Sequence, residues 1–544
     1  MTKKKRSKMP YIVFLLVILV VALAVVIYKL PVQEEGKADK KADKDKGITL
    51  EYGDSYVFSG DIKSVSGDDE KILKIDKDNP GKARAVECGK AAVELKSGET
   101  VRVTVEPARL TLVLFAGQSN CEGRLATDET VDTVRKRVVL NEPLTAFATY
   151  GVSDNETGEE VNWIRNPIEA LNVSNAKAYL PESLTDNSKN EEHNRTDTLT
   201  TDKDTAGKTG IDSAFAYEWY KNTGEKVWIV NAAHHGSKIQ SWIPTSEETD
   251  NNFWQAVELY RGAERILSKE IEAGHYVLAH KGILWCQGEN NYRMGSGEYV
   301  SRFQEMFEAF EEQLNGEGIA GLERELDFCG INIVRAAMDT PDNEEDFVLT
   351  GPRSAQFYMT TGEFDEKIIL AANVSEKWGN DNSVKEYFAD KYGNDEDFNA
   401  AYPKEDTQIK MPTSVREVHG GFHYTQLAYN EIGFDAADNI CEMISAGKNG
   451  KAGVEEIELV MEDGVTDRSG TTVNVTAGKY VPFAVKVFPA SRQKDVRISC
   501  SDNVIYDSKG LMITDEADSK GNITGEVKVT VGKTTRKIEI NGKN

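Results

Sequence analysis

The chain has 544 residues, which at roughly 150 residues per domain predicts three or four domains. Hydrophobic residues make up 39% and charged residues 28%, which excludes a largely disordered protein. The formal net charge of −25 argues against a nucleic-acid binder, which needs a basic face, and six cysteines exclude a disulfide scaffold.

The first thirty residues predict a membrane anchor. A basic stretch precedes an uncharged apolar run at 11–28, which as a helix would reach roughly 27 Å, close to the thickness of the hydrocarbon core. The basic side stays in the cytoplasm, so the pattern predicts a single-pass protein of the cell membrane with an extracellular C-terminal bulk. The alternative is a secreted protein, cleaved near Ala22-Leu23-Ala24. We assign residues 1–30 to a cytoplasmic tip and the transmembrane signal anchor. The charged, repetitive residues 31–47 are assigned to a tether.

Residues 48–109 and 454–544 each predict a small all-β domain. Short runs that alternate apolar and polar residues, such as 101–105 and 496–500, recur between turns rich in Gly and Asp. In this pattern both segments resemble bacterial immunoglobulin-like domains. The resemblance implies a spacing role or weak surface adhesion.

Residues 110–447 predict an α/β domain. Five runs, at 110–116, 226–233, 280–287, 329–337 and 367–374, are apolar almost throughout, as parallel strands buried on both faces are. Segments with helical spacing lie between them at 215–224, 253–274 and 299–316, and each ends at Gly. The alternation predicts a parallel sheet with helices on both faces. A polar, acidic stretch at about 125–210 breaks the pattern and is assigned to an insertion.

Polar clusters follow the strand ends, which is where ligands bind in open α/β sheets. Gly117-Gln118-Ser119-Asn120 follows the first run, 234–242 follows the second, and 287–291 follows the third. A further cluster lies at 419–424. We expect the four clusters to converge on one crevice.

The parts of this crevice suit acyl transfer. Ser119, just beyond a strand, is a candidate nucleophile whose own N–H would help to hold an oxyanion. Gly236 offers a backbone N–H that no Cβ obstructs, and Gln287 offers a side-chain N–H.

A serine nucleophile needs a base, and only seven histidines are present. His193 lies in the acidic insertion, and His275 and His280 lie where the chain enters a strand. The candidates that remain are His234, His235, His419 and His423.

These residues resemble the sialate O-acetylesterase family, which shares a branch of the SGNH (GDSL-type) hydrolases with acetyl xylan esterases. The motifs are GQSN at 117–120, Gly-Ser-x-Ile-x-x-Trp at 236–242, Trp-x-Gln-Gly-Glu at 285–289, and a late His-Tyr at 423–424 followed by Tyr-Asn-Glu-Ile-Gly at 429–433. The resemblance covers about 110–445. It implies a flavodoxin-like three-layer α/β/α fold and a serine esterase that removes acetyl groups from carbohydrate hydroxyls, with no metal or cofactor. By position, Ser119 matches the nucleophile, His423 matches the catalytic histidine, and Gly236 and Gln287 match the oxyanion donors.

One position departs from the family pattern. The family places an Asp three residues before the histidine to orient the imidazole, and here that position is Gly420. The nearest acids are Glu417 and Glu289, each a candidate for the orienting acid or for a substrate contact. Glu289 is equally a candidate for a structural hydrogen bonder. In the remaining alternative, a backbone carbonyl or a water orients His423 in a dyad.

We therefore expect a surface-tethered O-acetylesterase that acts on acetylated oligo- or polysaccharides and binds no nucleic acid. The alternative is a non-catalytic glycan-binding adhesin with a degenerate esterase site, which the β-rich flanks and Gly420 favour. Cys121 and Cys286 lie beside site motifs, either as free packing residues or, once exported and oxidised, as a bridge.

Overall fold

The computed structural model describes residues 47–66, 71–122, 124–125, 145–149, 168–169, 208–245, 251–333, 349–401, 410–419, 423–445, 453–461, 472–517 and 519–543. The chain divides into two units, 1–47 and 48–544, and the second unit holds all the helices and strands named in this section. The predicted anchor at 11–28 lies outside the described residues. Within the described ranges, no helix is both long enough and apolar enough to cross a membrane.

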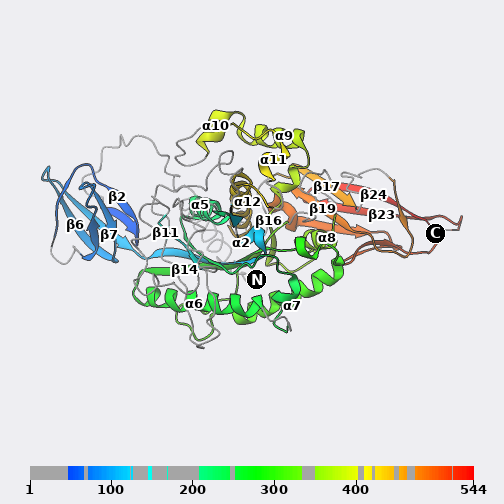
Figure 1. The fold of residues 1–544 in the computed structure, drawn as a ribbon, viewed down its shortest axis with the longest axis horizontal. Helices are drawn as coiled ribbons and strands as arrows, with labels where there is room; N and C mark the ends of the chain where they lie inside the picture. Colours follow the sequence, from blue (N-terminus) through cyan, green and yellow to red (C-terminus); the bar gives the residue numbers. More distant parts are fainter. Residues whose placement is uncertain are drawn as a thin grey trace, which may run out of the picture. The chain divides into compact units, whose positions relative to one another are not determined.

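A seven-stranded sheet forms the core of residues 108–372 (Figure 1). The five predicted strands form β8 (Ala108–Gly117), β13 (Lys226–Asn231), β14 (Tyr276–Cys286), β15 (Phe328–Asn332) and β16 (Ile368–Ala372). Their spatial order is β13-β8-β14-β15-β16, and all four neighbouring pairs are parallel. This is the 2-1-3-4-5 order of flavodoxin-like sheets, as the family resemblance implies.

The insertion at 125–210 extends this sheet at one edge. Its strand β10 (Thr145–Thr149) pairs with β13 in parallel, and β11 (Ile168–Glu169) pairs with β10 antiparallel. A separate two-stranded sheet joins β9 (Arg124–Leu125) to β12 (Lys208–Thr209). The insertion therefore contributes strands, whereas the sequence pattern predicts only a polar interruption.

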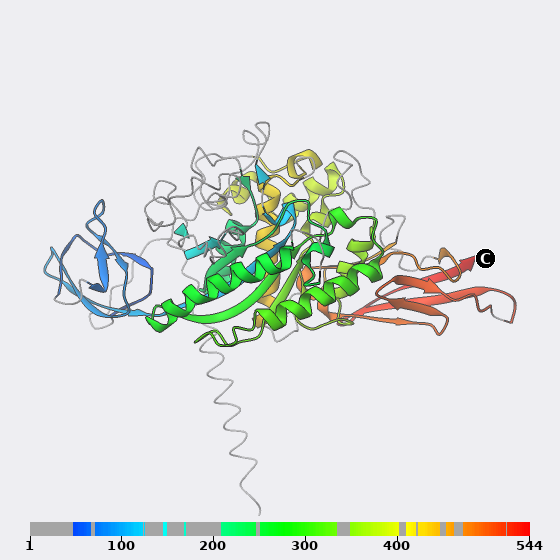
Figure 2. The ribbon, with the colours of Figure 1, turned by 60° about the horizontal axis from the view of Figure 1, so that its bottom comes forward.

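Helices cover both faces of the sheet because its strands carry apolar side chains on both faces. Along β8, the side chains of Leu110, Leu112 and Leu114 share a core with α6 (Asn252–Glu272) and α7 (Ser296–Gln313). The alternate side chains, Val113 and Phe115, share a core with α5 (Asp212–Thr223) and α12 (Gln426–Ser445). Figure 2 shows α6 and α7, drawn in green, along one face of the sheet. The predicted α/β arrangement is confirmed.

A helical stretch that no sequence pattern predicts lies between β16 and α12. It comprises η6 (Val374–Lys377), α9 (Asp381–Tyr392), α10 (Asp395–Ala400) and α11 (Val415–Val418). The buried carboxylate of Glu431 on α12 anchors α9, because it accepts from Tyr392 Oη at 2.6 Å, Tyr387 Oη at 3.1 Å and Lys391 Nζ at 2.5 Å. This stretch leads the chain back to the strand ends.

The N-terminal β domain (residues 48–106) consists of two small sheets with the orders β1-β7-β6-β3 and β2-β5-β4. The strands are β1 (Ile48–Glu51), β2 (Ser55–Val57), β3 (Ile62–Val65), β4 (Leu73–Ile75), β5 (Lys82–Ala85), β6 (Gly89–Leu95) and β7 (Thr100–Glu106). Only Pro107 separates β7 from β8, so the chain passes directly from this domain into the central sheet.

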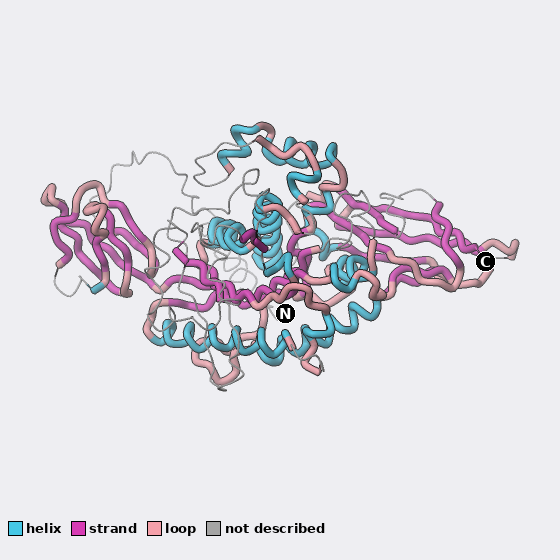
Figure 3. Tube along the Cα trace, viewed as in Figure 1, coloured by secondary structure: helices cyan, strands magenta, loops and turns pink. Residues whose placement is uncertain are grey.

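The C-terminal β domain (the described residues from 453 to 543) contains the sheets β17-β19, β18-β24-β23-β20 and β21-β22. The strands are β17 (Glu456–Met461), β18 (Thr472–Thr476), β19 (Phe483–Phe488), β20 (Val496–Cys500), β21 (Val504–Asp507), β22 (Gly510–Ile513), β23 (Ile523–Val531) and β24 (Thr534–Lys543). Figure 3 shows that strands dominate both flanking domains. The immunoglobulin-like character of the two domains stays a prediction.

Candidate functional site

The carboxyl ends of β8 and β14 lie side by side, where the strand order reverses and where doubly wound sheets bind their ligands. Gly117, the last residue of β8, pairs with Cys286, the last residue of β14. A Cβ on Gly117 would lie 2.0 Å from the Cys286 carbonyl oxygen, and its φ is +137°, so only glycine permits this close approach. The next turn starts helix α2 (Ser119–Glu122), which places Ser119 at this edge of the sheet.

Ser119 lies within hydrogen-bond distance of a histidine that is 304 residues away in the chain. His423 Nε2 is 2.9 Å from Ser119 Oγ, the distance at which an imidazole takes a proton from a serine hydroxyl. Ser119 is buried and His423 is partly buried. The structure thus brings together the predicted nucleophile and the predicted base.

The other three candidate histidines make different contacts. His234 and His235 stack on each other with their ring centroids 4.9 Å apart. His419 is buried, and its ring packs edge-on against Trp378 at 6.0 Å. Among the described contacts of the four histidines, only His423 reaches Ser119.

Two backbone amides at this edge of the sheet, those of Ser119 and Gly236, have no acceptor among the described residues. Ser119 begins α2, so its N–H has no partner within the helix. Gly236 has a φ of +67°, which favours glycine. The loop of Gly236 is held beside Ser119, because His234 N and Ser237 Oγ both donate to the Gly117 carbonyl, at 2.9 and 3.1 Å. These amides are candidate oxyanion donors.

The Gln287 side chain is fully buried and already donates within the protein. Its Nε2 lies 2.7 Å from Asn291 Oδ1, 3.1 Å from the Ser237 carbonyl oxygen and 3.4 Å from Gln118 Oε1. Tyr299 Oη donates to the Gln287 carbonyl at 2.5 Å. Donation to an oxyanion would require this amide to release one of its bonds. In the structure as it stands, Gln287 holds the loop that carries Gly236.

Asn120 and Tyr429 belong to the site, although the sequence reasoning assigned neither of them a role. Asn120 Nδ2 donates to Glu289 Oε1 at 2.7 Å, and Tyr429 Oη donates to Asn120 Oδ1 at 2.7 Å. All three side chains are buried. Glu289 therefore borders the site through the residue next to Ser119. The sequence did contain an indication of their role, because Asn120 lies inside GQSN and Tyr429 lies inside the late Tyr-Asn-Glu-Ile-Gly motif.

The Glu417 carboxylate caps the short helix α11. Its Oε2 accepts from the backbone N–H groups of Thr413 at 2.6 Å and Ser414 at 2.9 Å, and it lies 3.1 Å from Ser414 Oγ. The structure does not bring it into hydrogen-bond contact with His423. Gly420, the position of the missing family Asp, lies outside the described residues.

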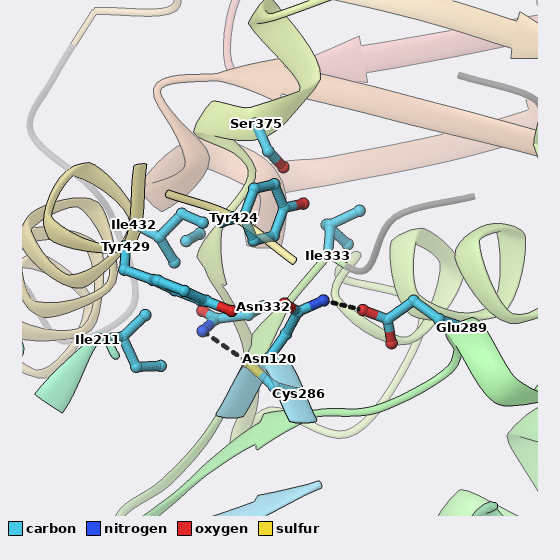
Figure 4. Close-up of a pocket in the computed structure, with 11 residues that line it drawn as sticks. Asn120, Ile211, Cys286, Glu289, Asn332, Ile333, Ser375, Tyr424, Tyr429 and Ile432 are labelled. Atoms are coloured by element: carbon cyan, nitrogen blue, oxygen red, sulfur yellow. Dashed lines mark hydrogen bonds between the residues drawn. The ribbon is translucent and has the colours of Figure 1, made fainter. Parts of the chain in front are cut away.

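A cavity of about 10 Å³, the space of one water molecule, lies beside Asn120 (Figure 4). Its polar lining comes from Asn120, Glu289, Asn332 and Ser375, and the Asn332 side chain donates to Cys286 Sγ at 2.8 Å. The remaining lining residues are Ile211, Cys286, Ile333, Ala372, Tyr424, Tyr429 and Ile432. The cavity is too small for a sugar ring, so it belongs to the packing that supports α2.

The two cysteines beside the site are free thiols, and both are buried. Burial and the neighbouring Cys286 raise the pKa of Cys121 well above its ordinary value, so this thiol stays protonated and is no rival nucleophile. In the described part of the chain, no three His, Cys, Asp or Glu side chains gather as a metal site would require.

Comparison with protein families gives one match, over residues 109–337. The matching model is described as SASA, carbohydrate esterase, sialic acid-specific acetylesterase. The matched range includes Ser119, Gly236, Gln287 and Glu289, and it ends before His423. No curated protein matches the chain.

Matches among solved structures include a protein from Arabidopsis thaliana, with 13% identity and a TM-score of 0.30 over 61% of this chain and 97% of that one. NanS has 13% identity and a TM-score of 0.31 over 63% of this chain and 98% of its own. A carbohydrate acetylesterase from Xanthomonas citri has 14% identity and a TM-score of 0.30 over 88% of this chain and 91% of its own.

Proposed function

We propose that this carboxylic ester hydrolase removes O-acetyl groups from carbohydrates with Ser119 and His423 as its catalytic pair, because residues 109–337 match the sialic acid-specific acetylesterase model of carbohydrate esterases. The observation that carries the assignment is the 2.9 Å distance between Ser119 Oγ and His423 Nε2 at the carboxyl edge of the sheet. A serine hydroxyl is a weak nucleophile until a base takes its proton, and the imidazole is placed to take it.

The first half of the reaction forms an acetyl-enzyme. Ser119 Oγ forms a bond to the acetyl carbonyl carbon while its proton passes to His423 Nε2. The carbonyl π electrons move to oxygen and give a tetrahedral oxyanion. The bond from carbon to the sugar oxygen then breaks, and that oxygen takes the proton from His423, so the deacetylated sugar leaves as an alcohol.

The second half restores the enzyme. Water gives its proton to His423 Nε2 as its oxygen attacks the acetyl carbon. The bond from carbon to Ser119 Oγ breaks, Oγ takes back the proton, and acetic acid leaves and ionises to acetate in solution. No further reactant is required, because the histidine alternates between base and acid.

The backbone N–H groups of Ser119 and Gly236 are the proposed donors to the oxyanion in both halves. Backbone donors cost no reorganisation during the reaction, and removal of one oxyanion donor typically lowers kcat by about 10²–10³. We assign Gln287 to the support of this pair, because its amide donates to the Ser237 carbonyl next to Gly236.

We further propose that the substrate is an acetylated sialic acid or an acetylated xylan at the outer face of the cell membrane. The apolar run at 11–28, preceded by cations, supports the membrane location. Of these two substrates, the net charge of −25 favours acetylated xylan, because the mean field of the protein repels anions and sialic acid carries a carboxylate.

The test is acetate release from acetylated xylan, acetylated sialic acid and an aryl acetate. Replacement of Ser119 by Ala should lower kcat/KM by about 10⁴ or more on any substrate that wild type hydrolyses, because the residual rate comes from binding alone. Equal, slow acetate release by both proteins would show that the assignment of Ser119 is wrong.

A fluorophosphonate probe adds a measurement that does not depend on the choice of glycan, because labelling requires an activated hydroxyl. We expect wild type to be labelled at Ser119 and the Ser119→Ala variant to stay unlabelled. Glycan binding without labelling or turnover would instead identify the adhesin.

A further inference from the structure

The residues around Ser119 rest on elements that touch the C-terminal β domain. One such element is helix α8 (Gly351–Met359), which lies between the Gln287 segment and β19 of that domain (Figure 1). Its Gln356 is fully buried, and Gln356 Nε2 donates to the Gln287 carbonyl at 2.8 Å. Since Gln287 in turn donates to the Ser237 carbonyl, α8 supports the loop that presents the Gly236 amide.

On its opposite side, α8 is fixed to the C-terminal β domain by a side chain that bonds to the backbone of β19. Ser354 Oγ donates to the Phe483 carbonyl at 3.0 Å and lies 3.3 Å from the Phe483 N–H. Phe357 of α8 shares a small apolar core with Val460 and Ala484 of that domain. Ser354 and Gln356 are two residues apart on one short helix, so a shift of β19 moves the donor to Gln287.

A buried ion cluster, Arg353–Glu376–Lys486, reinforces the same junction. The Glu376 carboxylate on η6 lies between Arg353 of α8 and Lys486 of β19, and the three side chains are 2%, 2% and 3% exposed in the order Arg353, Glu376, Lys486. Burial by itself would raise the pKa of Glu376, but the two cations outweigh burial and hold the pKa below its ordinary value. The cluster therefore joins α8, η6 and the C-terminal β domain through ionised groups.

The η6 side of this cluster leads to the histidine. Trp378 caps η6 and is fully buried. Its ring packs edge-on against His419 at 6.0 Å and Tyr424 at 6.3 Å, and these two residues flank the segment that carries His423. The ion cluster thus joins the two elements that support the site. Helix α8 supports the Gly236 loop, and η6 supports the segment that carries His423.

We propose that the C-terminal β domain is part of the catalytic unit. Through α8 it supports Gln356, which is the positioning residue for the loop that carries the Gly236 amide. This rests on the proposed function, because it assigns a role in that same reaction. Gln356 does not touch the substrate; it acts through Gln287. An oxyanion exists only after attack on the acetyl carbon. Loss of the Gln356 amide should therefore lower kcat and leave KM nearly unchanged.

The test replaces Gln356 by Met in the full chain, which keeps the shape and removes the donor. On an aryl acetate we expect kcat to fall about tenfold with KM within about twofold of wild type, since small displacements at a reacting centre are costly. Gln304→Met is the matched control, because Gln304 on α7 is exposed and donates only to the exposed Glu308. It should keep wild-type kcat and KM.

Two further variants cover the case in which Gln356→Met does not fold. Gln356→Glu restores a donor only while its buried carboxyl is protonated, so its kcat relative to wild type should fall as pH rises, with the folded fraction followed by circular dichroism. Ser354→Ala cuts the contact between α8 and β19 and should lower kcat about threefold.

Retention of kcat within about twofold by folded Gln356→Met would overturn the inference. If that variant does not fold, a kcat ratio for Gln356→Glu that does not vary with pH, or wild-type kcat in Ser354→Ala, would do the same. Absence of acetate release by wild type counts against the proposed function. Wild-type turnover with unaffected variants counts against this inference alone.

Discussion

The two β domains resemble each other in sequence pattern and differ in where they meet the esterase domain. The N-terminal β domain meets the amino ends of the central strands, at the beginnings of β8, β13 and β14. The C-terminal β domain meets α8, η6 and β16, next to the supports of Ser119 and His423. Ligands of a parallel sheet bind at the carboxyl ends of its strands. The C-terminal junction therefore lies near the site, and the N-terminal junction lies at the opposite edge of the sheet.

The N-terminal junction combines an ion pair with an aromatic contact, at the edge of the sheet that carries no reactive groups. Lys226 at the start of β13 is buried, and its Nζ lies 2.6 Å from Asp54 Oδ1. Tyr52 stacks on His275, just before β14, with ring centroids 4.1 Å apart. Among the described residues, nothing in this junction contacts a residue of the site, so we assign to it support of the fold without a part in catalysis.

The C-terminal junction teaches that an accessory domain can be part of a site without offering a reactive residue. Besides the ion cluster, Lys494 Nζ donates to the Ile368 carbonyl at 2.8 Å and Asn373 Nδ2 donates to the Val487 carbonyl at 3.2 Å. The C-terminal β domain, for which the sequence predicts a spacing role or weak surface adhesion, is joined to the strand and helix that frame the crevice.

The largest expected effect on stability comes from Glu376→Gln. This change removes the carboxylate that lies between the buried cations Arg353 and Lys486, and loss of one partner from a buried ion pair costs about 3–5 kcal/mol. Denaturant unfolding would measure the loss. Because the folded-state pKa of Glu376 is lowered, its contribution is present at neutral pH and is lost as pH falls through that pKa. Glu298→Gln, which breaks an exposed pair with Arg302, should change stability by no more than about 0.5 kcal/mol.

A matched pair of lysine variants compares the junctions directly. Lys486→Met and Lys226→Met each remove a buried cation that connects a β domain to the esterase domain. We expect Lys486→Met to lower kcat several-fold, because it loosens η6 and α8, and Lys226→Met to leave kcat unchanged. Steady-state kinetics on an aryl acetate decides this. Equal kcat values for the two variants would remove the distinction between the junctions.

The sequence predicted the central sheet and the two residues, Ser119 and His423, that meet at its carboxyl edge. Apolar runs marked the five strands because parallel strands buried on both faces tolerate few polar residues. Ser119 and His423 were identified by their motifs, and the structure brings them to 2.9 Å. The order of the strands followed from the family resemblance rather than from periodicity.

The supports of the site could not be predicted, because they depend on pairings between distant positions. Lys486 and Glu376 are 110 positions apart, and neither lies in a sequence motif that would indicate the other as its partner. A signal was present in β19, where apolar residues occupy both alternating sets, at 483, 485 and 487 and at 484 and 488. That pattern indicates a strand covered on both faces and argues against a free-standing spacer. Glu417 shows the opposite case. Its proximity to His423 in sequence suggested a catalytic role, but its carboxylate caps the helix α11.

The smallest expected effect is a pH dependence confined to the N-terminal junction. Burial would lower the pKa of His275, but its hydrogen bonds to Glu270 at 2.7 Å and Glu87 at 3.0 Å outweigh burial and raise it. The stability that His275 contributes is therefore fully present below its unfolded-state pKa of about 6.5 and is lost as pH rises through the folded-state value. The difference in melting temperature between wild type and His275→Asn should shrink from pH 5 to pH 8, while kcat stays the same in both proteins because this junction lies at the amino ends of the strands. A fall in kcat on this substitution would show that both β domains, and not only the C-terminal one, act on the site.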